Sequence, residues 1–263
     1  MSPEQRVRLT VEDGLAQLSF SAPERHNAID PAWVAALGDA VDAIAADGTV
    51  RAVLVTADGA SFSVGGDLAH FAREADRMPD ELDAMVRPFH RTLATLGDLP
   101  VPIVCAAQGP VAGGGLGLLW CADIVLVADT AKLAAGFPLL GLSGDGGSAW
   151  ALPRLVGLRR AQQFILGGKV LNADEAVEWG IASEVVPAAD LADRALAEGR
   201  RFAAGPTVAY GHARRLLRGA STVSWAEHLT LELDAQVACG ATDDAREGVA
   251  AFAARRPAAF TGR

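Results

Sequence analysis

Hydrophobic and polar positions alternate along the first twenty residues of the chain. Segments 6–10 and 15–20 flank the stretch "VEDG", and alternation on both sides of a polar, glycine-containing turn predicts a β-hairpin. Apolar residues then recur at helical spacing as far as Ile44, after an Asp30–Pro31 pair that is typical of a helix N-cap followed by proline at the first helical position. The chain is therefore expected to open with a hairpin and a helix.

Three short apolar runs follow, and each predicts a buried strand. They are "RAVLVTA" from Arg51, "VPIVCAAQG" from Val101 and "DIVLVAD" from Asp123. Each leads into a glycine-containing or irregular stretch, which indicates stacked turns of a ββα type. The pattern from Ala149 onward is mostly helical, with "NADEAVEWG" as a capped short helix and "ASEVVPAADL" as a strand or extended link.

No low-complexity linker separates these elements. We expect an α/β core over residues 1–190 and a helical region over residues 191–263, packed on that core or on a neighbouring subunit. Of the 263 residues, 51% are hydrophobic, which is enough for a substantial core.

Composition narrows the classes of partner. The formal net charge of −9 and the lack of a basic stripe disfavour nucleic acid. No apolar run reaches about 18 residues and "MSPEQRVRLTVEDG" has no apolar signal core, so we expect a cytoplasmic protein without a membrane partner. Cys105, Cys121 and Cys239 are odd in number and widely spaced, which favours reduced thiols, and no metal-ligand spacing joins them to the five histidines.

Two glycine-rich turns follow two of the predicted strands. In "GPVAGGGLGLLW" the chain turns into a helix near Gly114, where unpaired N–H groups reinforced by the helix dipole can hold an oxygen anion. Close helix packing explains the same glycines equally well. In "FSVGGDLAHF", Gly65 and Gly66 precede Asp67, which is expected to be a helix N-cap. The two turns are thus candidates to converge on one ligand atom.

Two polar side chains are further candidates. Asp145, in "LGLSGDGGSAW", is a possible helix cap, loop carboxylate or general base, and the isolated pattern favours the cap. His90, in "VRPFHRTLATL", has helical spacing typical of a surface or satisfied core histidine. No glycine cluster carries a P-loop lysine or the layout of a dinucleotide site.

Taken together, the chain resembles the enoyl-CoA hydratase/isomerase (crotonase) superfamily over almost its whole length. The resemblance is carried by "PERHNAID", "VRAVLVTADGASFSVGGDL", "PVPIVCAAQGPVAGGGLGLLWCADIVLVAD", "GLSGDGGSAWALPRLVG", "ADEAVEWGIASEVVP" and "EGVAAFAARRPAAFTGR". It implies an α/β spiral of ββα turns with a helical C-terminal trimerisation region, in a trimer or dimer of trimers. It also implies acyl-CoA thioester substrates, with coenzyme A as part of the substrate and no permanently bound cofactor.

The resemblance also implies roles for particular residues. Two backbone N–H groups hold a thioester enolate in this family, and the matching positions here are Gly66 and Gly114. The stretch "ERHNA" matches the segment that holds coenzyme A, which makes Arg25 and Ala28 expected contacts. Phe260 is expected to lie against coenzyme A, from its own or from a neighbouring subunit. Gly65 and Phe137 complete the set of expected substrate contacts.

The resemblance disfavours simple hydration. Hydratases of the family activate water with two glutamates, and those positions are Gly117 and Phe137 here. One acid–base residue, Asp145, remains. An aspartate there is similar to phenylacetate-type isomerases with the pattern "GLxPDxGG", although Gly144 replaces the proline.

It is also similar to 4-chlorobenzoyl-CoA dehalogenase, in which an aspartate attacks the ring and a helix histidine, matched by His90, assists. That branch carries tryptophan at position 137 and an aromatic residue at position 66, so its match is partial. We therefore expect an enoyl-CoA isomerase that shuttles the proton through Asp145, with His90 orienting Asp145 or protonating the substrate. A hydratase with unusual acid–base groups, a dehalogenase or hydrolase with a nucleophilic aspartate, and a silent CoA-ester binder remain alternatives.

Overall fold

A twisted six-stranded sheet forms the centre of the protein, for which the computed structural model describes residues 6–263. Its strands, in spatial order, are β1 (Val7–Glu12), β2 (Leu15–Phe20), β3 (Ala52–Ala57), β4 (Ile103–Ala107), β6 (Ile124–Ala128) and β9 (Glu184–Val186). The pair β1–β2 is antiparallel and every later pairing is parallel. The predicted hairpin is confirmed: Asp13 and Gly14 make a two-residue turn, and both have positive φ angles.

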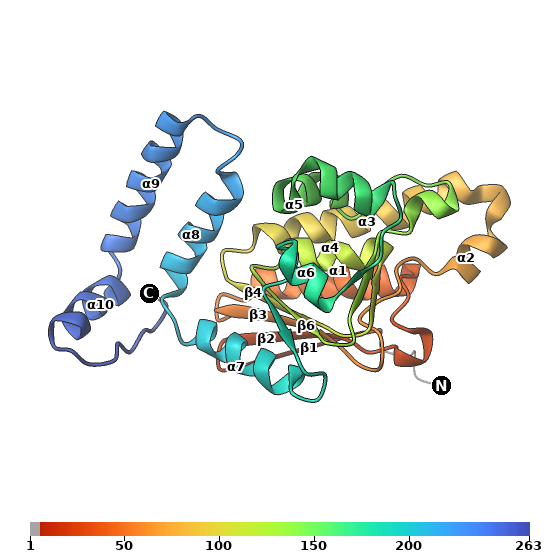
Figure 1. The fold of residues 1–263 in the computed structure, drawn as a ribbon. Coiled ribbons are helices and arrows are strands. Elements are labelled where there is room, and N and C mark those ends of the chain that lie inside the picture. The colour runs from red at the N-terminus through yellow and green to blue at the C-terminus, as the bar shows by residue number, and fades with distance from the viewer. Residues whose placement is uncertain (1–5) are drawn as a thin grey trace.

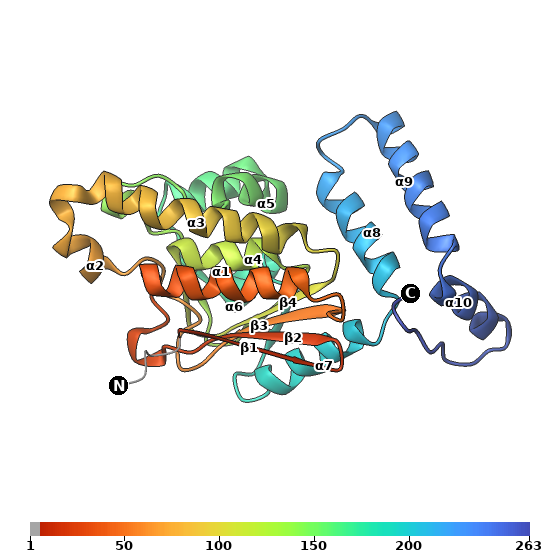
Figure 2. The same cartoon turned by 180° about the vertical axis from the view of Figure 1, so that it is seen from behind.

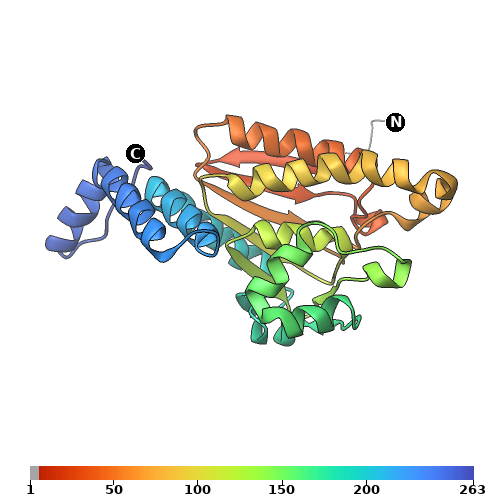
Figure 3. The same ribbon diagram turned by 90° about the horizontal axis from the view of Figure 1, so that it is seen from above.

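Helices cover both faces of the sheet, which explains why its strands read as continuous apolar runs (Figures 1 and 2). Alternate residues of β3 belong to two different cores. Val53 and Val55 pack toward α1 (Pro31–Ala46) and α3 (Met78–Asp98), whereas Leu54 packs toward α7 (Leu191–Ala203). Figure 3 shows α1 and α3 lying side by side across the first face.

A smaller sheet repeats the strand pattern of the larger one. Its strands are β5 (Pro110–Ala112), β7 (Lys132–Ala134) and β8 (Leu171–Asn172). The chain leaves β4 for β5 and leaves β6 for β7, so these two turns of the spiral each place one strand in each sheet, whereas the turn after β3 contributes only the Ser63–Val111 bridge. The predicted spiral of ββα turns is confirmed.

The remaining elements are short helices between strands and longer helices at the C-terminus. They are η1 (Pro23–Arg25), α2 (Leu68–Arg73), η2 (Ala75–Arg77), η3 (Gly113–Gly115), α4 (Leu116–Cys121), η4 (Phe137–Leu140), α5 (Ser148–Ile165, with a break at Gly157), α6 (Ala173–Glu178), α8 (Thr207–Gly219), α9 (Trp225–Gly240) and α10 (Asp243–Ala253). The cap at Asp30 is confirmed by its bond from the Trp33 N–H, and the cap at Asp67 by bonds from the Ala69 and His70 N–H groups. No helix within residues 6–263 has the length and apolarity needed to cross a bilayer.

The last three helices form an arm that extends from the core, at the opposite side of the molecule from α2 (Figures 1 and 2). Arg214 anchors it: this side chain is only 5% exposed, pairs with Asp123 at 2.7 Å and donates to three backbone carbonyl groups of the core. Helix α7 lies on the sheet instead, with Leu191 and Phe202 in the second core. Helix α7 therefore packs with the α/β core, although in sequence it belongs to the helical region that was expected to begin at residue 191.

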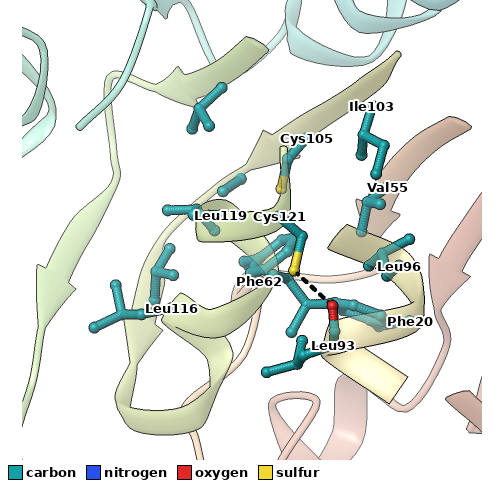
Figure 4. Close-up of a cluster of buried hydrophobic side chains, with 14 of the residues drawn as sticks. Phe20, Val55, Phe62, Leu93, Leu96, Ile103, Cys105, Leu116, Leu119 and Cys121 are labelled. Atoms are coloured by element: carbon teal, nitrogen blue, oxygen red, sulfur yellow. Dashed lines mark hydrogen bonds between the residues drawn. The ribbon is translucent and has the colours of Figure 1, made fainter. Parts of the chain in front are cut away.

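The first core contains two of the cysteines (Figure 4). The Cys121 thiol donates a hydrogen bond to the Leu93 carbonyl at 3.4 Å, and burial raises its pKa to about 11. Burial raises the pKa of Cys105 further. Both are free thiols, as expected, and Cys239 on α9 is a half-buried free thiol.

Candidate active site

A cavity of about 950 Å³ opens beside the carboxyl ends of β5 and β7. Its wall is mostly apolar and comes from the two glycine turns, α2, α3 and the segment 135–145. The lining residues are Ile29, Val64, Gly66, Leu68, Phe71, Pro79, Leu82, Asp83, Met85, Val86, Arg87, Phe89, His90, Ala112, Gly113, Gly114, Ala135, Gly136, Phe137, Leu139, Leu140, Leu142, Ser143, Gly144 and Asp145. An apolar cavity with a few polar groups is the usual form of a small-molecule site.

The two glycine turns touch each other at the floor of this cavity. Gly65 has φ +83°, and a Cβ there would lie 2.8 Å from the Ala112 carbonyl oxygen. Ser63 and Val111 form a parallel bridge that draws the two segments together, with the Ala112 N–H donating to the Ser63 carbonyl at 2.9 Å. Side chains at these positions would separate the turns, so glycine is required for their approach.

Each turn presents an unpaired N–H group. The Ile29 N–H donates to the Gly65 carbonyl at 2.8 Å, and the Ile29 carbonyl accepts from the Asp67 N–H at 2.9 Å. Because Gly66 lies between these two bonded residues, its N–H is directed away from Ile29. Gly114 lies in the first turn of η3, where N–H groups lack helical acceptors. Within residues 6–263, neither N–H donates a hydrogen bond. Two residues of the cavity wall thus have unpaired N–H groups, which are donors of the kind that stabilise an oxyanion.

The segment 26–30 holds the Gly66 turn in place. Asn27 is fully buried; its amide oxygen accepts from the Ala22 N–H at 3.0 Å, and its amide nitrogen donates to the carbonyl groups of Asp58 and Ser61. Its own carbonyl oxygen accepts from the Ser63 hydroxyl at 2.8 Å. "HNAID" is therefore a brace for the turn.

Asp145 and His90 meet at the cavity wall. His90 Nε2 lies 2.5 Å from Asp145 Oδ1, and the Gly146 N–H donates to the same oxygen at 2.6 Å. The other oxygen, Oδ2, faces Gly114, since a Cβ on Gly114 would lie 3.8 Å from it. The expected helix cap is wrong, because α5 begins after Gly147 and has no side-chain cap. One carboxylate oxygen is held by two partners while the other is directed at the donor turn.

Comparison with known proteins identifies the family. The family model described as enoyl-CoA hydratase/isomerase matches residues 10–263. The chain belongs to the enoyl-CoA hydratase/isomerase family. It is 37% identical to the 1,2-epoxyphenylacetyl-CoA isomerase of Escherichia coli K12, over 96% of this chain and 97% of that protein. It is 32% identical to the 4-chlorobenzoyl coenzyme A dehalogenase-2 of an Arthrobacter species, over 84% and 82% of the two chains.

A solved structure shares the fold closely. The enoyl-CoA hydratase of Polaromonas sp. JS666 aligns with a TM-score of 0.91 at 27% identity, covering 97% of this chain and 99% of that one. The crotonase fold expected from the sequence is thereby confirmed.

Position 117 has no room for a side chain in this member of the enoyl-CoA hydratase/isomerase family. A Cβ on Gly117 would lie 2.8 Å from Leu93 Cδ1 and 2.9 Å from the Gly146 carbonyl oxygen. Leu93 and the Gly146 backbone thus fill the space that a glutamate side chain would need at this position, where the resemblance implies one in hydratases. The second such position, Phe137, is buried against the cavity.

Four of the expected substrate contacts do not line the cavity, namely Gly65, Arg25, Ala28 and Phe260. Arg25 binds two carboxylates, Asp67 and Asp30, and Ala28 lies in the brace segment beside it. The Phe260 carbonyl accepts from Arg51, which precedes β3 and so lies at the opposite end of the strands from the glycine turns. A contact between Phe260 and coenzyme A stays a prediction that needs a neighbouring subunit.

Sequence reasoning missed several cavity residues. Ile29 approaches Gly114 most closely, at 3.1 Å from an added Cβ. Asp83 and Arg87 form an exposed ion pair at the wall. Their spacing of four along α3 was the available signal, since residues so spaced share one helix face.

Proposed function

We propose that this protein is an enoyl-CoA isomerase that moves a double bond through a thioester enolate. The Gly66 and Gly114 N–H groups hold the thioester oxygen as negative charge develops on it. Asp145 Oδ2 takes the proton from one carbon and returns it to another, so the substrate gains and loses no atoms. The carboxylate begins and ends each turnover ionised.

The observation that carries the proposal is the placement of a single carboxylate oxygen beside the donor turn. Oδ2 of Asp145 faces Gly114, whereas Gly117 and Phe137 supply no second acid–base group. Asp83, the other carboxylate at the wall, is engaged by Arg87, and its side chain is 61% exposed. One carboxylate suffices for a proton shuttle but leaves no pair to add water across a double bond.

The test is a panel of 3-enoyl, 2-enoyl and aromatic CoA esters, with products separated chromatographically and weighed by mass spectrometry. Isomerisation leaves mass unchanged, whereas hydration adds one water. Aromatic esters belong in the panel because Phe71, Phe89 and Phe137 line the cavity, and a ring epoxide of phenylacetyl-CoA belongs there because the Escherichia coli relative is named for it.

The Asp145→Asn variant should lose about 10²–10⁴-fold in turnover while binding CoA esters nearly as before, because only proton transfer is removed. Titration calorimetry measures the binding. Asp83→Asn is the matched comparison: if it, and not Asp145→Asn, abolishes turnover, the shuttle is misassigned.

A second candidate is a dehalogenase in which Asp145 Oδ2 attacks an aromatic carbon and chloride leaves, after which water hydrolyses the aryl ester to a hydroxyaryl-CoA. The His90 contact favours it, because it immobilises Oδ1 and leaves Oδ2 free. The Arthrobacter relative also supports it. Chloride release from 4-chlorobenzoyl-CoA, with an ester trapped on Asp145, would select this reaction.

We further propose that the chain assembles as a trimer or a dimer of trimers. Exposed apolar side chains on the arm support this; they include Leu217, Trp225, Leu233, Val237 and Phe252. Light scattering coupled to gel filtration gives the mass, and a monomer at micromolar concentration would contradict it.

A further inference from the structure

Arg25 sits between two carboxylates next to the Gly66 turn. Its guanidinium contacts Asp67 Oδ2 and lies 3.2 Å from Asp30 Oδ2. The carboxylates are 11% and 10% exposed, whereas the Arg25 side chain is 35% exposed. Asp30 Oδ2 also lies 3.4 Å from the Arg6 guanidinium, so Asp67 is the buried carboxylate that depends on Arg25 for compensation.

Asp67 follows Gly66 directly, and its bonds fix the chain on that side of the turn. Its N–H donates to the Ile29 carbonyl at 2.9 Å, and its Oδ1 accepts from two N–H groups at the start of α2. Burial alone would raise the pKa of Asp67, but the hydrogen bond from His70 N–H and the charge of Arg25 outweigh it and hold that pKa below its ordinary value. Asp67 is thus an ionised carboxylate one residue from the proposed oxyanion donor.

We propose that Arg25 is a positioning residue for oxyanion stabilisation, which neutralises the Asp67 charge and fixes the Gly66 turn instead of binding the phosphates of coenzyme A. This inference rests on the proposed enolate chemistry at that turn. A free carboxylate beside the turn would repel the negative thioester oxygen in the transition state more than the neutral thioester in the ground state. Loss of Arg25 therefore affects kcat more than KM.

The experiment is a double-mutant cycle on the ion pair, comparing Arg25→Met, Asp67→Asn and the double variant. Arg25→Met should lower kcat by about 10–100-fold, less than the about 10²–10³-fold loss when an oxyanion donor is removed outright, with KM changed by less than about threefold. The double variant should be at least about fivefold faster than Arg25→Met, since neither charge is left unpaired. A rise in KM at unchanged kcat, or no rescue by Asp67→Asn, overturns the proposal in favour of a coenzyme A contact.

A spectroscopic readout separates this proposal from the identity of the reaction. The absorption band of bound 4-(dimethylamino)cinnamoyl-CoA moves to longer wavelength when its thioester oxygen is polarised. Wild type should show this shift, Arg25→Met should lose most of it, and the double variant should recover part. If wild type shows the shift with this dependence but isomerises nothing in the panel, only the proposed reaction fails. If Arg25→Met keeps the full shift, or wild type shows none, the positioning role is wrong.

Two further variants guard against misfolding. Arg25→Lys keeps the charge but loses the forked geometry, and should lie between wild type and Arg25→Met in both readouts. Arg8→Met breaks an exposed pair with Asp58 that does not line the cavity, and should leave the shift and kcat unchanged. Equal losses in Arg8→Met and Arg25→Met would mean that the effect is not local to the turn, and would overturn the proposal.

Discussion

Replacing Gly117 with alanine tests whether a single missing methyl group keeps the Asp145 loop in place. Gly117 is inside α4, where alanine is ordinarily favoured over glycine by about 1 kcal/mol. Here the added Cβ would meet Leu93 Cδ1 at 2.8 Å and the Gly146 carbonyl oxygen at 2.9 Å. The leucine methyl can turn away, but the carbonyl belongs to the backbone next to Asp145.

The two effects oppose each other, and the contacts decide the sign. Overpacking a filled interior costs about 1–3 kcal/mol, which exceeds the propensity gain of about 1 kcal/mol. We therefore expect Gly117→Ala to destabilise the protein by about 0–2 kcal/mol. Because Gly146 N–H holds Asp145 Oδ1, displacement of Gly146 should also lower kcat, by about 10-fold or more. The Gly117→Glu variant should be worse on both counts and should not hydrate 2-enoyl-CoA.

Urea unfolding and steady-state kinetics on the accepted CoA ester measure both effects. Gly38→Ala is the matched control, because it is also inside a helix and its added Cβ meets only Thr92 Oγ1 at 3.4 Å, an ordinary contact. The control should be neutral or stabilising by up to about 1 kcal/mol. If Gly117→Ala is as stable and as active as Gly38→Ala, the closed packing at position 117 is not what excludes a glutamate.

Two predictions concern the arm and the tail. Arg214→Met should cost about 3–5 kcal/mol in urea unfolding, because it leaves Asp123 and three carbonyl groups without their shared donor; a loss below about 1 kcal/mol would show that the arm is held by other contacts. Glu247 has its pKa lowered to about 2 by hydrogen bonds from Arg256 and the Ala259 N–H. Since the folded pKa lies below the ordinary 4.5, the ionised Glu247 stabilises the fold fully above about pH 4.5, and this stabilisation is lost as the pH falls toward 2. The thermal unfolding temperature of Glu247→Gln should therefore change less between pH 4.5 and pH 2 than that of wild type. Equal changes in the two proteins would contradict this.

Local signals predicted the elements that depend on a few neighbouring residues. The hairpin at Asp13–Gly14 and the caps at Asp30 and Asp67 follow from short-range hydrogen bonds and backbone preferences. The two glycine turns were found because similar strands precede them. The Asp145 cap was wrong because two positive-φ glycines, Gly146 and Gly147, follow it and delay the helix.

Pairings between distant segments needed the structure. His90 and Asp145 are 55 residues apart, and their contact depends on how α3 is rotated against the loop before α5. Arg25 and Asp67 are 42 residues apart, and nothing in "ERHNA" indicates that the arginine binds the aspartate that follows the Gly65–Gly66 turn. Helix α7 has a strongly amphipathic sequence that fits a sheet face or a subunit interface equally well, so its place on the sheet was also open.

The sequence left two explanations for the glycine cluster, close packing and oxyanion binding. Both follow from the close approach of the cluster's backbone to the neighbouring segments. A Cβ on Gly115 would lie 2.9 Å from Ser63 Cβ, and a Cβ on Gly117 would lie 2.9 Å from the Gly146 carbonyl oxygen. These two glycines bring η3 and α4 against both the Gly65–Gly66 turn and the Asp145 loop. That approach places the unpaired Gly114 N–H in the same cavity as the Gly66 N–H and Asp145 Oδ2. Larger residues at the packing positions would therefore remove the proposed chemistry without touching the substrate.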